Sequence, residues 1–298
     1  MVNQIVLIIG QYLTTIRARI LVISISIGIV LIFIKLNGFD LHHASINTNN
    51  YSGSSKSLSL VRVKPITLCV IIRVHRGHIT YLPVLVLALA HAGFDNIRLY
   101  VVNIDRNIDI QLLFRTIDSL NRLASRAAYV SLLSLGLPGE NDFGFIVTDR
   151  ALTFLYNQHE QSPFLCQYVI LTNGDNLYSQ HLGKNLLPHM IAQKDIIAWD
   201  FVSRYYRADY INKNKNREET SPQVVDTGTA KCLPVALQLG SADLGAVAYR
   251  LAFLKQHKLH IHYPDGTYDV NSDGSFAKTA SGLTNTSVIL RQTLFIHQ

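Results

Sequence analysis

From residue 66 to the end of the chain, short apolar runs alternate with longer segments that mix apolar and polar positions. The run Ile66–Val74 is apolar and rich in β-branched residues, which is typical of a strand covered on both faces. Strands that alternate with helices of about ten to fifteen residues predict an α/β domain with a mostly parallel sheet and flanking helices. The predicted strands are 66–74, 97–102, 128–133, 168–171, 196–202 and 287–296, and the predicted helices are 82–92, 110–124, 149–156 and 242–255.

Two polar stretches interrupt this alternation. Residues 204–229 are charged and lack any periodicity, so we expect a lid or binding loop that could close over a ligand, or else a disordered segment. In such a loop Arg204 and Arg207 could contact a diphosphate. Residues 265–274 are rich in Asp, Asn and Gly and predict a turn.

The predicted sheet also indicates where a ligand binds. In open α/β sheets the site lies beyond the carboxyl ends of the strands. Three segments meet that condition: 73–78, 103–105 and 173–176. We expect their side chains to line one crevice.

The first 65 residues differ from the rest in pattern. Ile20–Ile34 carries no charge, and Leu36 extends the run past Lys35, so residues 20–36 are predicted to be a transmembrane signal anchor. Two arginines precede the run, which leaves residues 1–19 in the cytosol and sends the following chain into the lumen. Residues 37–65 are rich in Ser and Asn and predict a flexible stem. A cleaved signal peptide is the alternative.

The net charge of the chain predicts an anionic partner. The chain has 298 residues, is 48% hydrophobic and carries a formal net charge of +7. Its Lys and Arg residues are scattered, which disfavours nucleic acid and leaves acidic lipid or a phosphorylated substrate. Asn50 and Asn285 begin glycosylation sequons that are usable only on a luminal side.

Three cysteines are too few for a disulfide framework. Cys69 and Cys166 lie in or beside apolar runs and are expected to be buried thiols. A bridge between Cys166 and Cys232 is the alternative in an oxidising lumen.

The segment Asn173-Gly174-Asp175-Asn176 carries the most specific chemistry. It places a carboxylate at the end of a buried strand, beside a glycine that permits a tight turn. Such a carboxylate can hold Mg²⁺ or Mn²⁺, and the cation then neutralises charge on a departing diphosphate. An ordinary turn is the competing interpretation, and the position in the predicted crevice favours the cation site.

Further features agree with this site: the anchor and stem, Arg73 on the first strand, Ala242-Asp243-Leu244-Gly245, Asp273-Gly274-Ser275-Phe276, and a last strand that ends in His297. With them, residues 66–298 resemble membrane-anchored glycosyltransferases of the GT-A fold, in the nucleotide-diphospho-sugar transferase superfamily. In these families the fourth strand ends in an Asp-x-Asp motif. The resemblance implies that Asp175 and His297 hold the metal, and Asn173 stands in place of the first acidic residue.

The resemblance also implies roles for the remaining polar residues. Asp273 would be the general base of an inverting transfer, with an Asp-Gly turn as the structural alternative. Asp243 would contact the donor, although it is also a good helix N-cap. Arg73 and His75 would meet the nucleotide or its phosphates, and Asp105 its base or ribose. The lone tryptophan, Trp199, is either core or a sugar platform.

The expected function is therefore metal-assisted transfer of a sugar from a nucleotide-diphosphate donor to a glycan or protein hydroxyl. The expected location is the Golgi or endoplasmic reticulum membrane, in single-pass type II topology. A catalytically inactive luminal protein that binds nucleotide or glycan is the alternative, and a membrane-tethered scaffold is a third. No nucleic acid is expected among the partners.

Overall fold

The computed structural model describes residues 65–124, 128–139, 142–158, 165–207, 224–269 and 271–298. For residues 204–207 and 224–228 only the backbone is described. The predicted cytosolic tail, anchor and stem lie outside the described residues, apart from Pro65. Among the helices that are described, none combines the length and the apolar character that crossing a membrane requires.

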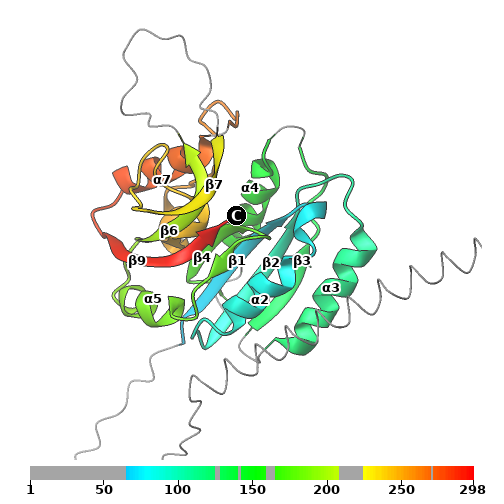
Figure 1. Cartoon of the computed structure of the whole chain (residues 1–298). Coiled ribbons are helices and arrows are strands. Elements are labelled where there is room, and N and C mark those ends of the chain that lie inside the picture. The colour runs from blue at the N-terminus through cyan, green and yellow to red at the C-terminus, as the bar shows by residue number, and fades with distance from the viewer. Residues whose placement is uncertain (1–64, 125–127, 140–141, 159–164, 208–223, 270) are drawn as a thin grey trace, which may run out of the picture. The chain divides into compact units, whose positions relative to one another are not determined.

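A parallel half of the sheet is built from the first four strands, in the order β3-β2-β1-β4 (Figure 1). These strands are parallel because a helix connects each to the next. The strands are β1 Thr67–Val74, β2 Asn96–Asn103, β3 Ala128–Leu133 and β4 Tyr168–Asn173, and the connecting helices are α2 Leu82–Ala90, α3 Ile110–Leu123 and α4 Phe145–Tyr156.

The other half of the sheet is mixed. It continues from β4 through β8-β6-β9-β5, with β7 paired to β6. Only the β6–β9 pair is parallel here, so the expectation of a mostly parallel sheet holds for the first half alone. The elements are β5 Leu177–Tyr178, α5 Leu182–Ile191, β6 Ile196–Arg207, β7 Val224–Leu233, β8 Val247–Arg250, α6 Leu251–Gln256, α7 Ser272–Gly282 and β9 Ser287–His297.

The central strands form the core. All eight residues of β1 are buried, because α2 and α3 pack on one face of the sheet and α4 and α6 on the other. Trp199, on β6, is fully buried, so its core interpretation is confirmed and its role as an exposed sugar platform is wrong.

The predicted helix 242–255 is wrong. The segment forms a 3-10 turn, η3, at Leu244–Ala246, then the short strand β8, then helix α6. β8 lies between β4 and β6 and is covered on both faces, so its apolar residues carry no alternation that would distinguish a strand from a helix.

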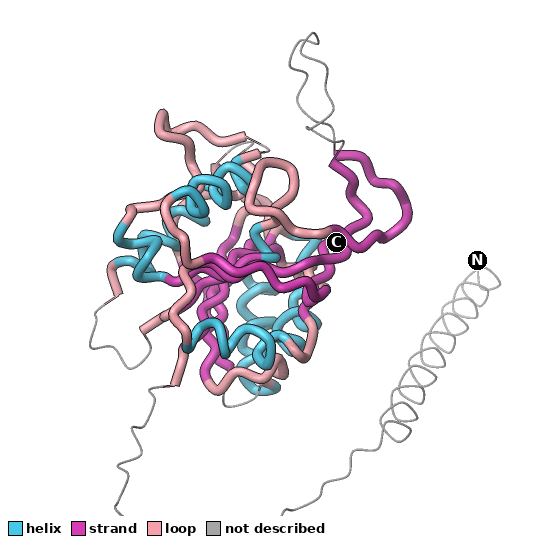
Figure 2. The backbone as a smooth tube through the Cα atoms, turned by 90° about the vertical axis from the view of Figure 1, so that its left-hand side faces the viewer, coloured by secondary structure: helices cyan, strands magenta, loops and turns pink. Residues whose placement is uncertain are grey.

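Two predicted polar segments also contain regular structure. Helix α7 begins at Ser272, inside the predicted turn 265–274. The predicted loop 204–229 begins and ends in strands, because β6 continues to Arg207 and β7 starts at Val224. The two strands form a hairpin that projects from the body in Figure 2, and residues 208–223 lie outside the described part.

The cysteines pair differently from the expectation. Cys69 and Cys166 are buried as predicted, but they form a disulfide, and Cys232 is exposed and unpaired. Cys69 lies on β1 and Cys166 shortly before β4, the parallel neighbour of β1. The predicted alternative, a bridge from Cys166 to Cys232, is therefore wrong.

Candidate functional site

The carboxyl ends of β1, β2 and β4 meet at one edge of the sheet. Arg73 on β1 is the register partner of Asn173 on β4, and the backbone amide of Gly174 donates to the carbonyl of Arg73 at 2.9 Å. The end of β2 joins them, because the amide of Ile104 donates to the carbonyl of Val74 at 3.0 Å. The structure thus brings together the three segments that the strand-end rule selects.

The C-terminal strand reaches the same edge (Figure 1). β9 pairs with β5, so that Ile296 lies opposite Leu177, and the amide of Gln298 donates to Asn176 Oδ1 at 3.3 Å. Asp175 and His297 therefore occupy one corner of the sheet although the chain separates them widely.

A buried arginine stands at the centre of the site. The Arg73 side chain packs over the Phe145 ring, 5.3 Å from its centroid, and Nη1 donates to the carbonyl of Phe143 at 3.4 Å. Burial lowers the pKa of Arg73 below its usual value, and four negative charges oppose that shift. The four carboxylates are those of Asp243, Asp273, Asp175 and Asp142.

Two polar atoms at this edge are buried without a hydrogen-bond partner among the described residues: Arg73 Nε, a donor, and Asp175 Oδ1, an acceptor. An unpaired buried group costs free energy, and the cost is larger for a charged group. A bound species that carries both anionic oxygens and a cation would satisfy both atoms.

Asp175 is held on its other side. His78 Nε2 lies 3.3 Å from Asp175 Oδ2. Burial raises the pKa of Asp175, but the hydrogen bond and charge of His78 and the charge of His297 act against it, and the net pKa is lowered. The carboxylate is therefore ionised at neutral pH.

Asp243 and His297 face each other. Asp243 caps the η3 turn, with Oδ1 accepting from the amide of Gly245 at 2.8 Å. Its Oδ2 lies 3.7 Å from Nδ1 of His297, and Ser203 Oγ lies 3.2 Å from the same nitrogen. The capping role expected for Asp243 is thus observed, on a 3-10 turn rather than an α-helix.

Asp273 is buried in the first turn of α7. Its Oδ1 accepts from the amide of Gly274 at 2.7 Å. The first turn of a helix favours a negative charge, which stabilises a carboxylate at this place. The negative charge of Asp273 raises the pKa of Arg73, against the effect of burial.

His75 and Asp105 lie at the outer part of the edge and serve local turns. His75 Nδ1 accepts from the amide of Gly77 at 3.0 Å, and burial lowers its pKa. Asp105 accepts from the amides of Asn107 at 2.8 Å and Arg76 at 3.1 Å, and these two bonds lower its pKa. Contact of either residue with a nucleotide stays a prediction.

Two residues of the site were given no individual role in the sequence analysis. Asp142 lies three residues before the start of α4, and its two oxygens accept from the amides of Gly144 at 3.2 Å and Ile146 at 2.9 Å. Its position before an apolar run is a helix-start signal, but the predicted helix begins only at Asp149. His78 follows β1 on a 3-10 turn, η1, and lies within the predicted segment 73–78.

Few side chains at this edge could ligate a metal ion. Among the residues that the structure describes, no group of three or more His, Cys, Asp or Glu side chains could hold a metal ion. A cation here would need ligands from a bound molecule as well as from the chain.

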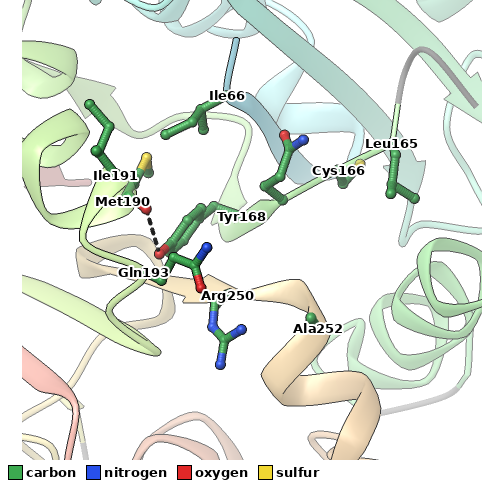
Figure 3. Close-up of a pocket in the computed structure, with 10 residues that line it drawn as sticks. Ile66, Leu165, Cys166, Tyr168, Met190, Ile191, Gln193, Arg250 and Ala252 are labelled. Atoms are coloured by element: carbon green, nitrogen blue, oxygen red, sulfur yellow. Dashed lines mark hydrogen bonds between the residues drawn. The ribbon is translucent and has the colours of Figure 1, made fainter. Parts of the chain in front are cut away.

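A cavity of about 380 Å³ lies at the opposite end of β4 (Figure 3). Two of its polar side chains are paired within the protein: Tyr168 donates to the carbonyl of Lys194 at 2.7 Å, and Arg250 donates to Asp195 at 2.7 Å. Among the described residues that line this cavity, none holds a buried polar atom without a partner.

No known protein family matches the sequence, and no curated protein resembles it significantly. Some solved structures match over part of their length. Residues 1–349 of TarS from S. aureus match at 15% identity and a TM-score of 0.48, over 78% of this chain and 60% of that one. The same protein in complex with UDP-GlcNAc matches at 16% identity and a TM-score of 0.48, over 78% and 58%. The 4-diphosphocytidyl-2C-methyl-D-erythritol synthase of Anaerococcus prevotii DSM 20548 matches at 9% and 0.40, over 76% and 87%. The chain thus spans less than two thirds of the TarS chain in both cases.

Proposed function

We propose that the chain is a glycosyltransferase that moves a sugar from a nucleotide-diphosphate donor to a hydroxyl of a glycan or protein. The observation that carries this proposal is the pair of unpartnered buried atoms, Arg73 Nε and Asp175 Oδ1, at the carboxyl edge of the sheet. A diphosphate supplies an acceptor for Arg73 Nε, and its cation supplies a positive charge for Asp175 Oδ1.

Arg73 would hold the donor diphosphate. Its guanidinium is buried beside Phe145, where a charge interaction is stronger than in water. The surrounding carboxylates would repel a bare diphosphate, so one arginine does not suffice. The excess negative charge favours a donor that arrives with a divalent cation.

The residues present fit such a cation. Asp175 Oδ1 is buried and unpartnered, and it is the atom that would coordinate the ion. His297 lies at the same corner and is the second candidate ligand, together with oxygens of the diphosphate. Imidazole suits Mn²⁺ better than Mg²⁺. When bound, the cation would neutralise charge on the departing diphosphate.

Asp273 would act as the general base. A buried carboxylate near the donor can take the proton from an acceptor hydroxyl as that hydroxyl attacks the anomeric carbon, with inversion. Asp243 is held by the η3 turn beside His297, which suits a residue that orients the donor sugar or a metal ligand.

We also propose that the domain works in the lumen of the Golgi or endoplasmic reticulum, tethered by residues 20–36. A Cys69–Cys166 disulfide is typical of an oxidising compartment. The sequon residue Asn285 is exposed and available for a glycan.

The test is turnover of a panel of nucleotide sugars by the purified full chain with Mn²⁺. We expect release of nucleoside diphosphate from one donor, abolished in Asp175→Ala and retained in Asp118→Ala, an exposed aspartate on α3. No release from any donor, with no binding of any nucleotide, would refute the proposal.

A non-catalytic nucleotide or glycan binder is the second candidate. It is favoured by Asn173 in place of an acidic residue and by the small ligand set among the described residues. Nucleotide binding in the same panel without turnover would support this candidate over the enzyme.

A further inference from the structure

His78 links the backbone of β1 to the carboxylate of Asp175. Its Nδ1 lies 3.3 Å from the carbonyl oxygen of Arg73, and its Nε2 lies 3.3 Å from Asp175 Oδ2. The ring is buried, with 7% of the residue exposed. Nε2, where it carries hydrogen, donates to the Asp175 carboxylate, and Nδ1 faces a carbonyl oxygen, which can only accept.

Neighbours on two sides keep this ring in place. The His75 ring lies against it, with centroids 3.5 Å apart. Gly174, which directly follows β4, leaves the space that His78 fills. A Cβ on Gly174 would lie 3.0 Å from the Cβ of His78 and 3.0 Å from Cγ2 of Val74. The glycine of the Asn-Gly-Asp segment is thus matched to the histidine.

We infer that His78 is a positioning residue that orients the Asp175 carboxylate for cation binding. It engages Oδ2 and leaves Oδ1, the unpartnered oxygen, for the ion. Partners of this kind fix metal-binding groups, and their loss typically weakens metal affinity about 10- to 100-fold. The inference rests on the proposed function, because it concerns the cation of the same site.

Two substitutions of His78 test the contacts of its two ring nitrogens separately. The side-chain amide nitrogen of glutamine reaches about as far as Nε2 of histidine, and that of asparagine about as far as Nδ1. His78→Gln therefore keeps a donor for Asp175, and His78→Asn keeps only the contact with the Arg73 carbonyl. His91→Gln, at an exposed position after α2, is the matched control.

The experiment measures Mn²⁺ affinity of the full chain in the presence of UDP, from the electron paramagnetic resonance of free Mn²⁺. We expect His78→Asn to weaken Mn²⁺ binding about tenfold or more, and His78→Gln to stay within about threefold of the wild type. Thermal unfolding without metal should give similar midpoints for both variants, since a general loss of structure would lower Mn²⁺ affinity without any specific role for Nε2.

Equal Mn²⁺ affinity in wild type, His78→Asn and His78→Gln would overturn the positioning role and leave the proposed function standing. Equal weakening in both variants would also overturn it, because the Nε2 donor would not matter. A wild-type chain that binds no Mn²⁺ with UDP would remove the cation from the proposed function, and the inference would fall with it.

Discussion

Arg73 and Asp175 each hold one buried polar atom without a hydrogen-bond partner in the described residues, at the ends of two adjacent parallel strands. One atom is a donor on a cation and the other an acceptor on an anion. Each unpaired buried group costs about 1–3 kcal/mol, and charged groups cost more. A ligand bound at this edge would recover this cost, as is expected at a binding site.

Ligand binding should therefore stabilise the folded chain. We expect UDP with Mn²⁺ to raise the thermal midpoint by several degrees, since saturation at 100 times Kd adds about 2.7 kcal/mol. Arg73→Lys should lose most of this shift, because lysine has no counterpart of Nε and no planar fork. Differential scanning fluorimetry measures the ligand-induced shift of the thermal midpoint. Arg115→Lys, on the exposed side of α3, is the control. An unchanged shift in Arg73→Lys would contradict the role of Arg73.

The Cys69–Cys166 disulfide should be a major source of stability. It closes a loop with a sequence separation of 97 residues, and such bridges typically contribute about 2–4 kcal/mol. We expect Cys69→Ala with Cys166→Ala to lower the free energy of unfolding by about that amount in urea titrations. Cys232→Ser should change it by less than about 0.5 kcal/mol, because Cys232 is exposed and unpaired. If the double alanine variant and Cys232→Ser lost similar amounts of unfolding free energy, the prediction that the bridge is a major source of stability would be contradicted.

Gly174 should tolerate no side chain. Alanine there would place its Cβ 3.0 Å from two side-chain carbons, so these neighbours must give by a few tenths of an ångström, at an expected cost of about 1–3 kcal/mol. Gly282→Ala is the matched control, since a Cβ at Gly282 meets nothing within 4 Å. Chemical denaturation of the two variants tests this, and equal stability would mean that the turn adapts without cost.

The parts of this fold that were predictable depend on local pattern. β1 is apolar except at Thr67 and Arg73, as expected of a strand covered on both faces, and the strand-end rule then led to Arg73 and Asp175. β8 was missed because its pairing with β4 and β6 decides its conformation, and those strands are remote in sequence. The same applies to Cys69, whose partner depends on which strand lies beside β1.

Asp195 should stabilise the fold without affecting the site. It accepts from Thr284 at 2.6 Å, from Thr286 at 2.7 Å and from Arg250 at 2.7 Å, at the amino end of β6. Burial raises the pKa of Asp195, but these hydrogen bonds outweigh it, and the net pKa is lowered. Since the folded pKa is below the unfolded value of about 3.9, the stabilisation is present above that pH and is lost as pH falls through the folded pKa.

We therefore expect Asp195→Asn to be less stable than wild type near neutral pH, with the difference shrinking as the pH falls below about 4. Urea unfolding across pH measures this difference. UDP affinity should be unchanged, because Asp195 lies away from the carboxyl edge. A difference that grows at low pH would mean that the carboxyl is not held in its charged form.

Substitution of Asp273 should distinguish a role in catalysis from a role in donor binding. If its carboxylate removes the acceptor proton, Asp273→Asn should lower kcat for transfer by about 10²- to 10⁴-fold and leave the donor KM within a few fold. The amide keeps the size of the side chain and an oxygen for the amide of Gly274, so α7 should still form. Asp265→Asn is the control, because Asp265 lies in an exposed Asp-Gly turn of the same segment. Steady-state kinetics with the donor varied at saturating acceptor give kcat and the donor KM of both variants. A loss in donor affinity with unchanged kcat would assign Asp273 to donor binding, and the base would then have to be sought elsewhere.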